Sequence, residues 1–268
     1  MRRLLSFDCK GDTLAATLDE GRRSTGLIII SGGNEIRIGA HRGMAKLAQD
    51  IAAEGYPVFR FDRRGVGDSE GENKGFMGSA DDIEAAVSEY QAACPTLTSI
   101  VGFGNCDAAS ALTIHAPMKI DAFVLANPWV IEPSNDLPPP AAIKARYIQK
   151  LSDPRALFRL FTGGVNLRKL LSGIRSIAEP ASPSIIAGLV ANGMDKFNGP
   201  LHILLAEHDS TAIAFSDQWK QPAFSKIRER VNVTVQTIDS ASHSFASEAD
   251  YKALKASVLS VLQNQHEQ

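Results

Sequence analysis

Hydrophobic and polar residues follow two different periods along this chain, and together they predict strands that alternate with helices. Short, continuous apolar runs are typical of strands buried in a parallel sheet. Such runs lie within residues 25–34, 56–62, 99–103, 121–129, 199–209 and 231–239. Helical spacing of apolar residues recurs over 40–54, 79–93, 107–116 and 247–263, with Ser79 as the N-cap of the second helix. Two runs flanking Gly11-Asp12, Leu4–Asp8 and Thr13–Leu18, predict an N-terminal hairpin.

This alternation predicts an α/β fold, with a mostly parallel central sheet flanked by helices on both faces. Residues 130–197 break the pattern because they contain no core strand. We therefore assign 1–129 and 198–268 to the core, and 130–197 to a helical insertion that forms a lid. The insertion holds nine Lys or Arg against five Asp or Glu. That excess suits an acidic substrate, although a solvated helical surface explains it equally well.

The composition excludes several classes of function. A length of 268 residues, 44% of them hydrophobic and 22% charged, is typical of a globular protein with a substantial core. The net charge of −2 gives no reason to expect nucleic acid or an anionic membrane as a partner. The N-terminus has no signal-peptide pattern and no run has the length of a membrane span.

Cysteine usage points to a reducing compartment. The three cysteines, Cys9, Cys94 and Cys106, are odd in number and lack the spacing of metal ligands. They indicate reduced thiols in a cytoplasmic protein. We expect no metal and no cofactor, because no metal-ligand cluster, phosphate loop or dinucleotide signature is present.

The stretch GFGNCDAA has the outline of the sharp strand-to-helix turn that exposes a catalytic nucleophile. Small residues must stand two positions before and after the nucleophile, since strand and helix approach closely there. Gly104 and Ala108 meet this requirement around Cys106. A shift of the register to Asp107 fits less well, because Asn105 would replace a glycine. Cys106 is therefore the predicted nucleophile, with a small buried residue as the alternative interpretation.

An acid and a histidine follow two later strands. Asp209 ends the run ILLAEHD, and His243 lies in the loop after the last predicted strand. The order nucleophile, acid, histidine is that of α/β-hydrolases, and all three residues fall at the carboxyl ends of strands. We predict a Cys106–His243–Asp209 triad. Glu207 and His208 are the nearest competitors, and Asp209 alone also suits a helix cap.

Two glycine-rich motifs accompany these residues. The SGGN stretch follows the third strand and predicts an oxyanion donor, the N–H of Gly33 or Asn34, together with the N–H of Asp107. The carboxylate of Asp107 is expected to point away from the site, because its charge would oppose a thiolate. The motif FDRRGVGDSEG predicts a structural turn after a strand, with Arg63 or Arg64 facing a substrate as the alternative.

Outside the insertion the chain resembles the α/β-hydrolases almost from end to end. More narrowly, it resembles the exosortase A system-associated hydrolases of type 1 in SGGNEIRIGAHRG, FRFDRRGVGDSEG and GFGNCDAASAL. That resemblance implies a cysteine at the turn and a bacterial protein encoded near exosortase and exopolysaccharide functions. The chain departs from typical hydrolases at Ser31-Gly32, where those proteins have His-Gly.

These residues predict a hydrolase that cleaves an ester or thioester of a small acyl substrate. Cys106 would attack the acyl carbonyl and form a covalent acyl-enzyme, and His243, oriented by Asp209, would protonate the leaving group and then activate water. The site resembles that of dienelactone hydrolase, which also uses cysteine. Two alternatives stay open: an acyltransferase with the same site, and a catalytically silent fold that binds a small molecule or a partner protein.

Overall fold

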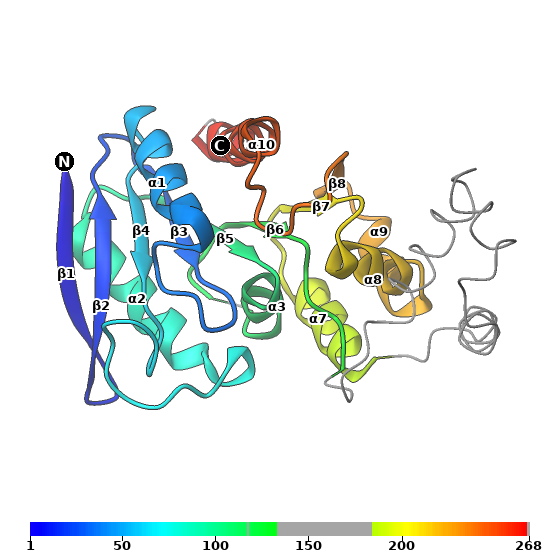
Figure 1. The fold of residues 1–268 in the computed structure, drawn as a ribbon, viewed down its shortest axis with the longest axis horizontal. Helices are drawn as coiled ribbons and strands as arrows, with labels where there is room; N and C mark the ends of the chain where they lie inside the picture. The colour runs from blue at the N-terminus through cyan, green and yellow to red at the C-terminus, as the bar shows by residue number, and fades with distance from the viewer. Residues whose placement is uncertain (117, 133–183, 267–268) are drawn as a thin grey trace, which may run out of the picture.

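The computed structural model of the chain describes residues 1–116, 118–132 and 184–266, and these residues form one mixed sheet (Figure 1). Its eight strands run in the order β1-β2-β4-β3-β5-β6-β7-β8. They are β1 (Arg2–Cys9), β2 (Asp12–Asp19), β3 (Thr25–Ile30), β4 (Val58–Phe61), β5 (Ser99–Asn105), β6 (Ala122–Ala126), β7 (Leu201–Ala206) and β8 (Val233–Ile238). The pairs β1–β2 and β2–β4 are antiparallel, and the other neighbours are parallel. The predicted fold class is confirmed.

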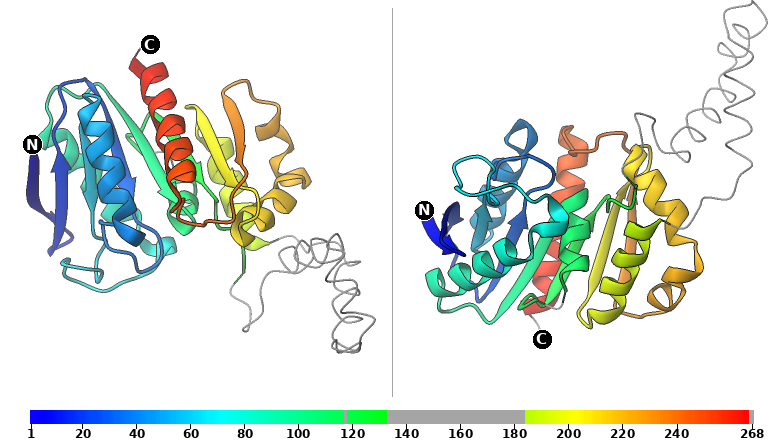
Figure 2. Two further views of the ribbon diagram at one scale, coloured as in Figure 1. Left: turned by 45° about the horizontal axis from the view of Figure 1, so that its top comes forward. Right: turned by 90° about the horizontal axis from the view of Figure 1, so that it is seen from below.

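Helices cover both faces of this sheet. They are α1 (Gly43–Ala53), α2 (Ala80–Ala93), α3 (Asp107–Ile114), α7 (Ile185–Lys196), α8 (Ser210–Trp219), α9 (Ser225–Arg228) and α10 (Glu248–His266), with short 3-10 turns at Ala40–Arg42, Phe76–Gly78 and Pro222–Phe224. One apolar cluster joins α1 and α10 to the sheet, and a second joins α2, α3, α7, α8 and α9 to it. Figure 2 shows α1 and α10 on one face, and α2, α3 and α7 on the other.

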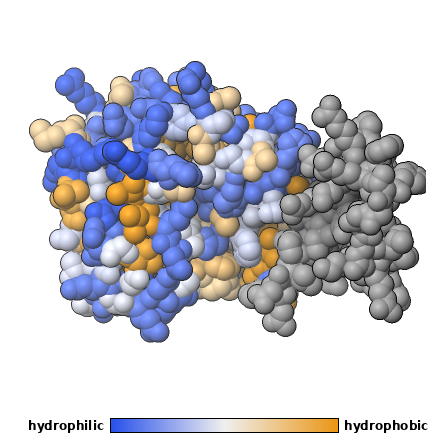
Figure 3. Space-filling model, viewed as in Figure 1, coloured by the Kyte–Doolittle hydropathy of each residue, from blue (hydrophilic) through white to orange (hydrophobic). Residues whose placement is uncertain are grey.

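Burial in the central strands agrees with the apolar runs that predicted them, whereas β8 at the edge of the sheet has no buried residue. Every residue of β3 and β6 is buried, as expected of central strands with helices on both sides. The N-terminal hairpin is also confirmed, but its turn lies one residue earlier than the predicted Gly11-Asp12. Cys9 pairs with Asp12, and Lys10 and Gly11 between them both have positive φ. The face of the molecule drawn in Figure 3 is mainly hydrophilic. None of the helices in the described part of the chain is long and apolar enough to cross a membrane.

Most of the insertion expected at 130–197 lies outside the described residues. Its predicted role as a lid therefore stays a prediction. The described end of the insertion contains α7, which belongs to the layer of helices that packs on the sheet. Val190 and Met194 are fully buried in that helix. A Cβ at Gly193 would come within 1.9 Å of the carbonyl oxygen of Thr113, so α7 lies directly against α3.

A buried carboxylate ties the loop after β3 to the turn after β4. Asp62 is fully buried and accepts a hydrogen bond from the backbone N–H of Arg37 and one of 3.1 Å from that of Asp68. The guanidinium of Arg37 pairs with the same carboxylate. Gly67 has a φ of 59°, and a Cβ there would come within 2.4 Å of Asp62 Oδ2. The structural interpretation of the FDRRGVGDSEG motif is therefore confirmed for its aspartate and for this glycine.

The start of α2 contacts this turn and differs in one detail from the prediction. Arg64 is paired with Asp82 at 2.5 Å and lies 3.6 Å from Asp81, so it faces α2 and the alternative of contact with a substrate is wrong for it. Ser79 does occupy the N-cap position of α2, but its hydroxyl donates to the carbonyl of Phe76 and caps no helical N–H. The two aspartates stabilise the positive end of the helix dipole in its place.

Replacement of Asp62 by alanine should destabilise the fold strongly, because the guanidinium of Arg37, whose side chain is 14% exposed, would lose its main counter-charge. We expect a loss of about 3–5 kcal/mol in the free energy of unfolding, measured by urea denaturation. Asp68→Ala is the matched control, since Asp68 pairs with the same guanidinium but its side chain is 73% exposed. It should cost less than about 1 kcal/mol. Equal losses in the two variants would contradict this account.

Candidate active site

Cys106 occupies the turn between β5 and α3 in a strained backbone conformation. Its φ of 62° and ψ of −127° lie outside the regions that non-glycine residues favour. Hydrogen bonds hold the turn, since the N–H of Cys106 donates to Ala126 and its carbonyl accepts from Trp129. A Cβ at Gly104 would come within 2.6 Å of the backbone of Ala108, which is the close approach that the sequence predicted. Asp107 is already the first residue of α3, so the strained position belongs to the cysteine.

Asp209 and His243 lie together at the same edge of the sheet. The Asp209 carboxylate is buried, and its Oδ2 is 3.1 Å from Nδ1 of His243. The same oxygen accepts hydrogen bonds from the N–H groups of Thr211 and Ala212 at the start of α8. Asp209 is thus both the cap of a helix and the partner of the histidine. Because Nδ1 is taken by the carboxylate, Nε2 is the nitrogen that is left for another partner.

Both partners stabilise the charged form of His243. The hydrogen bond to Asp209, followed by that to the Cys106 thiol, raises the pKa of His243 to about 10, although burial opposes the shift. Burial tends to raise the pKa of Asp209 as well, but the hydrogen bond and charge of His243 and the two helix N–H groups outweigh it and lower the pKa. At neutral pH the pair is therefore an imidazolium beside a carboxylate.

Two asparagines that the sequence analysis did not single out carry the backbone of His243. The side-chain amide of Asn105 donates to the carbonyl of His243 at 3.0 Å. Asn127 is fully buried with a φ of 41°, and its amide donates to the same carbonyl and to Asn105 Oδ1 at 3.3 and 3.2 Å. Its Oδ1 accepts from the N–H of Ala206 at the end of β7. The only signal in the sequence is that each asparagine lies near the carboxyl end of a predicted apolar strand.

The competing residues beside Asp209 do not join the site. Glu207 is exposed. His208 pairs at 2.9 Å with Asp239, and both side chains are at least half exposed. Neither residue makes a described contact with Cys106.

The loop after β3 contacts α3 through a charged side chain. The N–H of Gly33 donates to Oδ1 of Asp107 at 2.7 Å, so the expectation that this carboxylate points away is wrong. The physical reason is that a hydrogen bond from a backbone N–H to a carboxylate is charge-assisted and therefore stronger than a bond between neutral groups. The N–H of Asn34 makes no hydrogen bond within the described part of the chain. Of the two alternatives for the oxyanion donor, the one at Asn34 is therefore free.

The other two cysteines are not placed for chemistry. Burial, followed by the Asp82 carboxylate, raises the pKa of Cys9 to about 11, and burial also raises the pKa of Cys94. All three cysteines are free thiols. Within the described residues no cluster of three or more His, Cys, Asp or Glu side chains could hold a metal ion.

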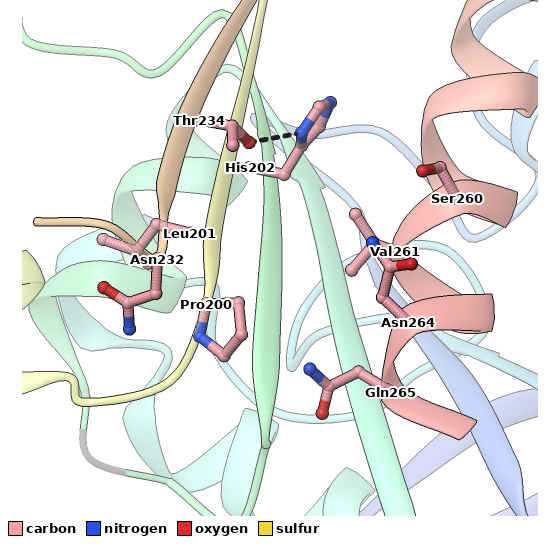
Figure 4. A pocket seen from close by; sticks show the side chains of 9 residues that line it. All are labelled: Pro200, Leu201, His202, Asn232, Thr234, Ser260, Val261, Asn264 and Gln265. Atoms are coloured by element: carbon pink, nitrogen blue, oxygen red, sulfur yellow. Dashed lines mark hydrogen bonds between the residues drawn. The ribbon is translucent and has the colours of Figure 1, made fainter. Parts of the chain in front are cut away.

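A surface cleft of about 680 Å³ lies at the amino-terminal ends of β7 and β8, opposite the ends that carry the candidate site (Figure 4). It opens between the start of β7, the start of β8 and the end of α10, whereas Asp209 follows the end of β7. His202 lines it and bonds Thr234 at 2.8 Å, and burial lowers the pKa of this histidine, which favours the neutral ring. The cleft is separate from Cys106 and the residues around it.

Solved structures with this fold span the whole chain. The esterase Pf2001 of Pyrococcus furiosus is 19% identical and aligns over 98% of this chain and 91% of its own, with a TM-score of 0.66. GrgF from Penicillium sp. sh18, an alpha/beta hydrolase, is 16% identical over 100% of both chains, with a TM-score of 0.66. Est1E of Butyrivibrio proteoclasticus, solved with ferulic acid, is 18% identical over 98% of this chain and 100% of its own, with a TM-score of 0.62.

No curated protein matches the chain in sequence. A family model does: that of serine aminopeptidase S33 matches residues 25–174, a span that runs from β3 through the turn at Cys106 and covers more than half of the chain. With the eight-stranded sheet and the strained turn at the end of β5, this match identifies the chain as a member of the serine aminopeptidase S33 family, with the α/β-hydrolase fold.

Proposed function

We propose that this protein hydrolyses carboxylic esters or thioesters through a covalent acyl-enzyme on Cys106. The observation that carries the proposal is the placement of Cys106. It lies on a strained turn at the start of α3, where its thiol contributes to the raised pKa of His243, and Nδ1 of that histidine is 3.1 Å from Asp209. A nucleophile, a base and a residue that orients the base are the three parts that acyl transfer needs.

The proposed reaction has two halves. The Cys106 thiolate attacks the acyl carbonyl, and the N–H groups of Asn34 and Asp107 bind the oxyanion that forms. The leaving alkoxide or thiolate departs with the proton of His243. The neutral imidazole then takes a proton from water, the hydroxide attacks the thioester carbonyl, and the carboxylic acid leaves as the thiolate is restored. Each oxyanion donor contributes about 3 kcal/mol to such a step.

The substrate class follows from the chemistry of sulfur and from the comparisons. A thiolate is a good leaving group, so an acyl-cysteine forms readily from thioesters and activated esters and poorly from amides. The similarity to Pf2001, which is named an esterase, and to Est1E, which was solved with the carboxylic acid ferulic acid, supports a carboxylic ester. The family name refers to a serine, and the resemblance to the exosortase A system-associated hydrolases of type 1 supports cysteine as a working nucleophile in its place. The basic excess of residues 130–197 supports an acidic group on the substrate.

Brief incubation with p-nitrophenyl acetate, followed by an acid quench and intact mass measurement, tests the nucleophile. The parent protein should carry one acetyl group and release nitrophenol, and Cys106→Ala should do neither. Cys9→Ala is the matched control, because that buried thiol has a raised pKa and should not react. An adduct on folded Cys106→Ala would overturn the assignment.

The pH dependence tests the role of Asp209. The acylation rate should fall as the pH rises through about 10, where His243 loses the proton that the leaving group needs. Asp209→Asn removes the largest cause that raises this pKa, so the falling limb should move to lower pH, towards the ordinary histidine value. Rates are measured in single turnovers from pH 5 to 11. Asp239→Asn, which removes the partner of the exposed His208, should leave the profile unchanged; a limb that stays in place in Asp209→Asn contradicts the proposal.

Asn127 offers a separate test of how the histidine is held. Asn127→Ala should lower kcat about 10- to 100-fold, because the His243 backbone would lose a donor and shift. It should also cost about 1–3 kcal/mol in the free energy of unfolding, since the N–H of Ala206 would lose its acceptor. Asn127→Gly is the control, because glycine relieves the positive φ but restores no hydrogen bond. Full activity in the glycine variant would show that backbone strain, not the amide, is responsible.

A further inference from the structure

Arg63 is a buried arginine without a carboxylate partner. It is 3% exposed, and no ion pair within 4.0 Å involves it in the described residues. Its Nη2 donates to the carbonyl oxygen of Gly33, and its Nε is buried with no hydrogen-bond partner among those residues. The next residue, Arg64, has a buried ion pair with Asp82. The two arginines therefore differ sharply in what they bind.

A buried guanidinium of this kind is costly to keep. Burial lowers the pKa of Arg63, and the charges of Asp107 and then Asp82 compensate only in part. A structural position filled for packing alone is better served by an apolar side chain of similar size. Arg63 does bind a backbone carbonyl in the loop after β3. This contact is therefore the one that has to explain why a charged side chain is kept here.

The peptide group that Arg63 binds is the one that carries the Asn34 N–H. A peptide unit is planar and trans, so its carbonyl and its N–H point in opposite directions. With the Gly33 carbonyl bound to the buried guanidinium, the Asn34 N–H points away from that guanidinium, and Gly33 and Asn34 are both exposed. A charged donor on the carbonyl also polarises the unit and makes its N–H a stronger donor.

Asp107 secures the same loop from its other side. Its carboxylate binds the N–H of Gly33, and a Cβ at Gly32 would come within 2.5 Å of the same Oδ1. Gly33 has a φ of 54°, a conformation that glycine adopts freely. Both ends of Gly33 are thus held by charged side chains, one from the turn after β4 and one from α3.

We propose that Arg63 is a positioning residue for the oxyanion hole: its guanidinium orients and polarises the Gly33–Asn34 peptide, while Asp107 holds the preceding N–H. The proposal rests on the proposed function, because the Asn34 N–H matters only if an oxyanion forms beside Cys106. Arg63 touches no substrate in this account and acts through the backbone of the loop.

The test compares two reactions of the same thiol in Arg63→Met. Acylation by p-nitrophenyl acetate passes through an oxyanion, whereas alkylation by iodoacetamide forms none. Arg63→Met should slow acylation about 10- to 100-fold, which does not exceed the rate loss on removal of one oxyanion donor. It should change the rate of alkylation by less than about twofold. Arg63→Lys keeps the charge and should recover part of the rate. Arg64→Lys is the matched control and should leave the ratio of the two rates unchanged.

The outcomes separate this proposal from the one beneath it. Parental acylation in folded Arg63→Met would overturn the positioning role, and so would a parallel loss of both reactions, which indicates a structural role. A parent protein that is alkylated at Cys106 but never acylated would overturn the proposed function, whatever Arg63 does. If circular dichroism shows that Arg63→Met is unfolded, the comparison of Arg63→Lys with Arg64→Lys decides. A selective loss of acylation in the first supports the role, and equal ratios overturn it.

Discussion

One buried amide joins the chain segments that carry the candidate triad. The side chain of Asn127 bonds the end of β7 at Ala206, the residue before the nucleophile at Asn105, and the carbonyl of His243. Parallel strands bring these segments to one edge of the sheet, but the edge alone leaves the loops free to take many directions. Because the amide is fully buried, a shift of any one segment leaves a polar atom without a partner, which costs free energy. The relative positions of Cys106 and His243 depend on this constraint.

The turn after β4 serves the fold and the candidate site with adjacent residues. Asp62 and Arg64 form buried ion pairs that fix the turn to the loop after β3 and to α2. Arg63, between them, binds a backbone carbonyl of the same loop.

Charge is balanced closely around the thiol. The hydrogen bond to Asp209, followed by the Cys106 thiol, raises the pKa of His243 to about 10, which favours its positive charge. Asp107 brings a negative charge next to the nucleophile, but its carboxylate is bound by the N–H of Gly33 and lies near the guanidinium of Arg63. A carboxylate that is hydrogen-bonded in this way opposes a nearby anion less than a free one does.

The sequence by itself determined the α/β fold, the succession of strands and helices along the chain, the residue at the strained turn, and the pairing of Asp209 with His243. Those features depend on local patterns: apolar periodicity, small residues around a tight turn, and polar residues at strand ends. It did not reveal α8, the packing of α7 on α3, the role of Asn127, or the contact between Asp107 and Gly33. These were decided by the tertiary structure, because they depend on hydrogen bonds and packing between distant segments. Gly33 and Asp107 are 74 residues apart, and Asn127 and Ala206 are 79 apart, so no local pattern encodes either contact.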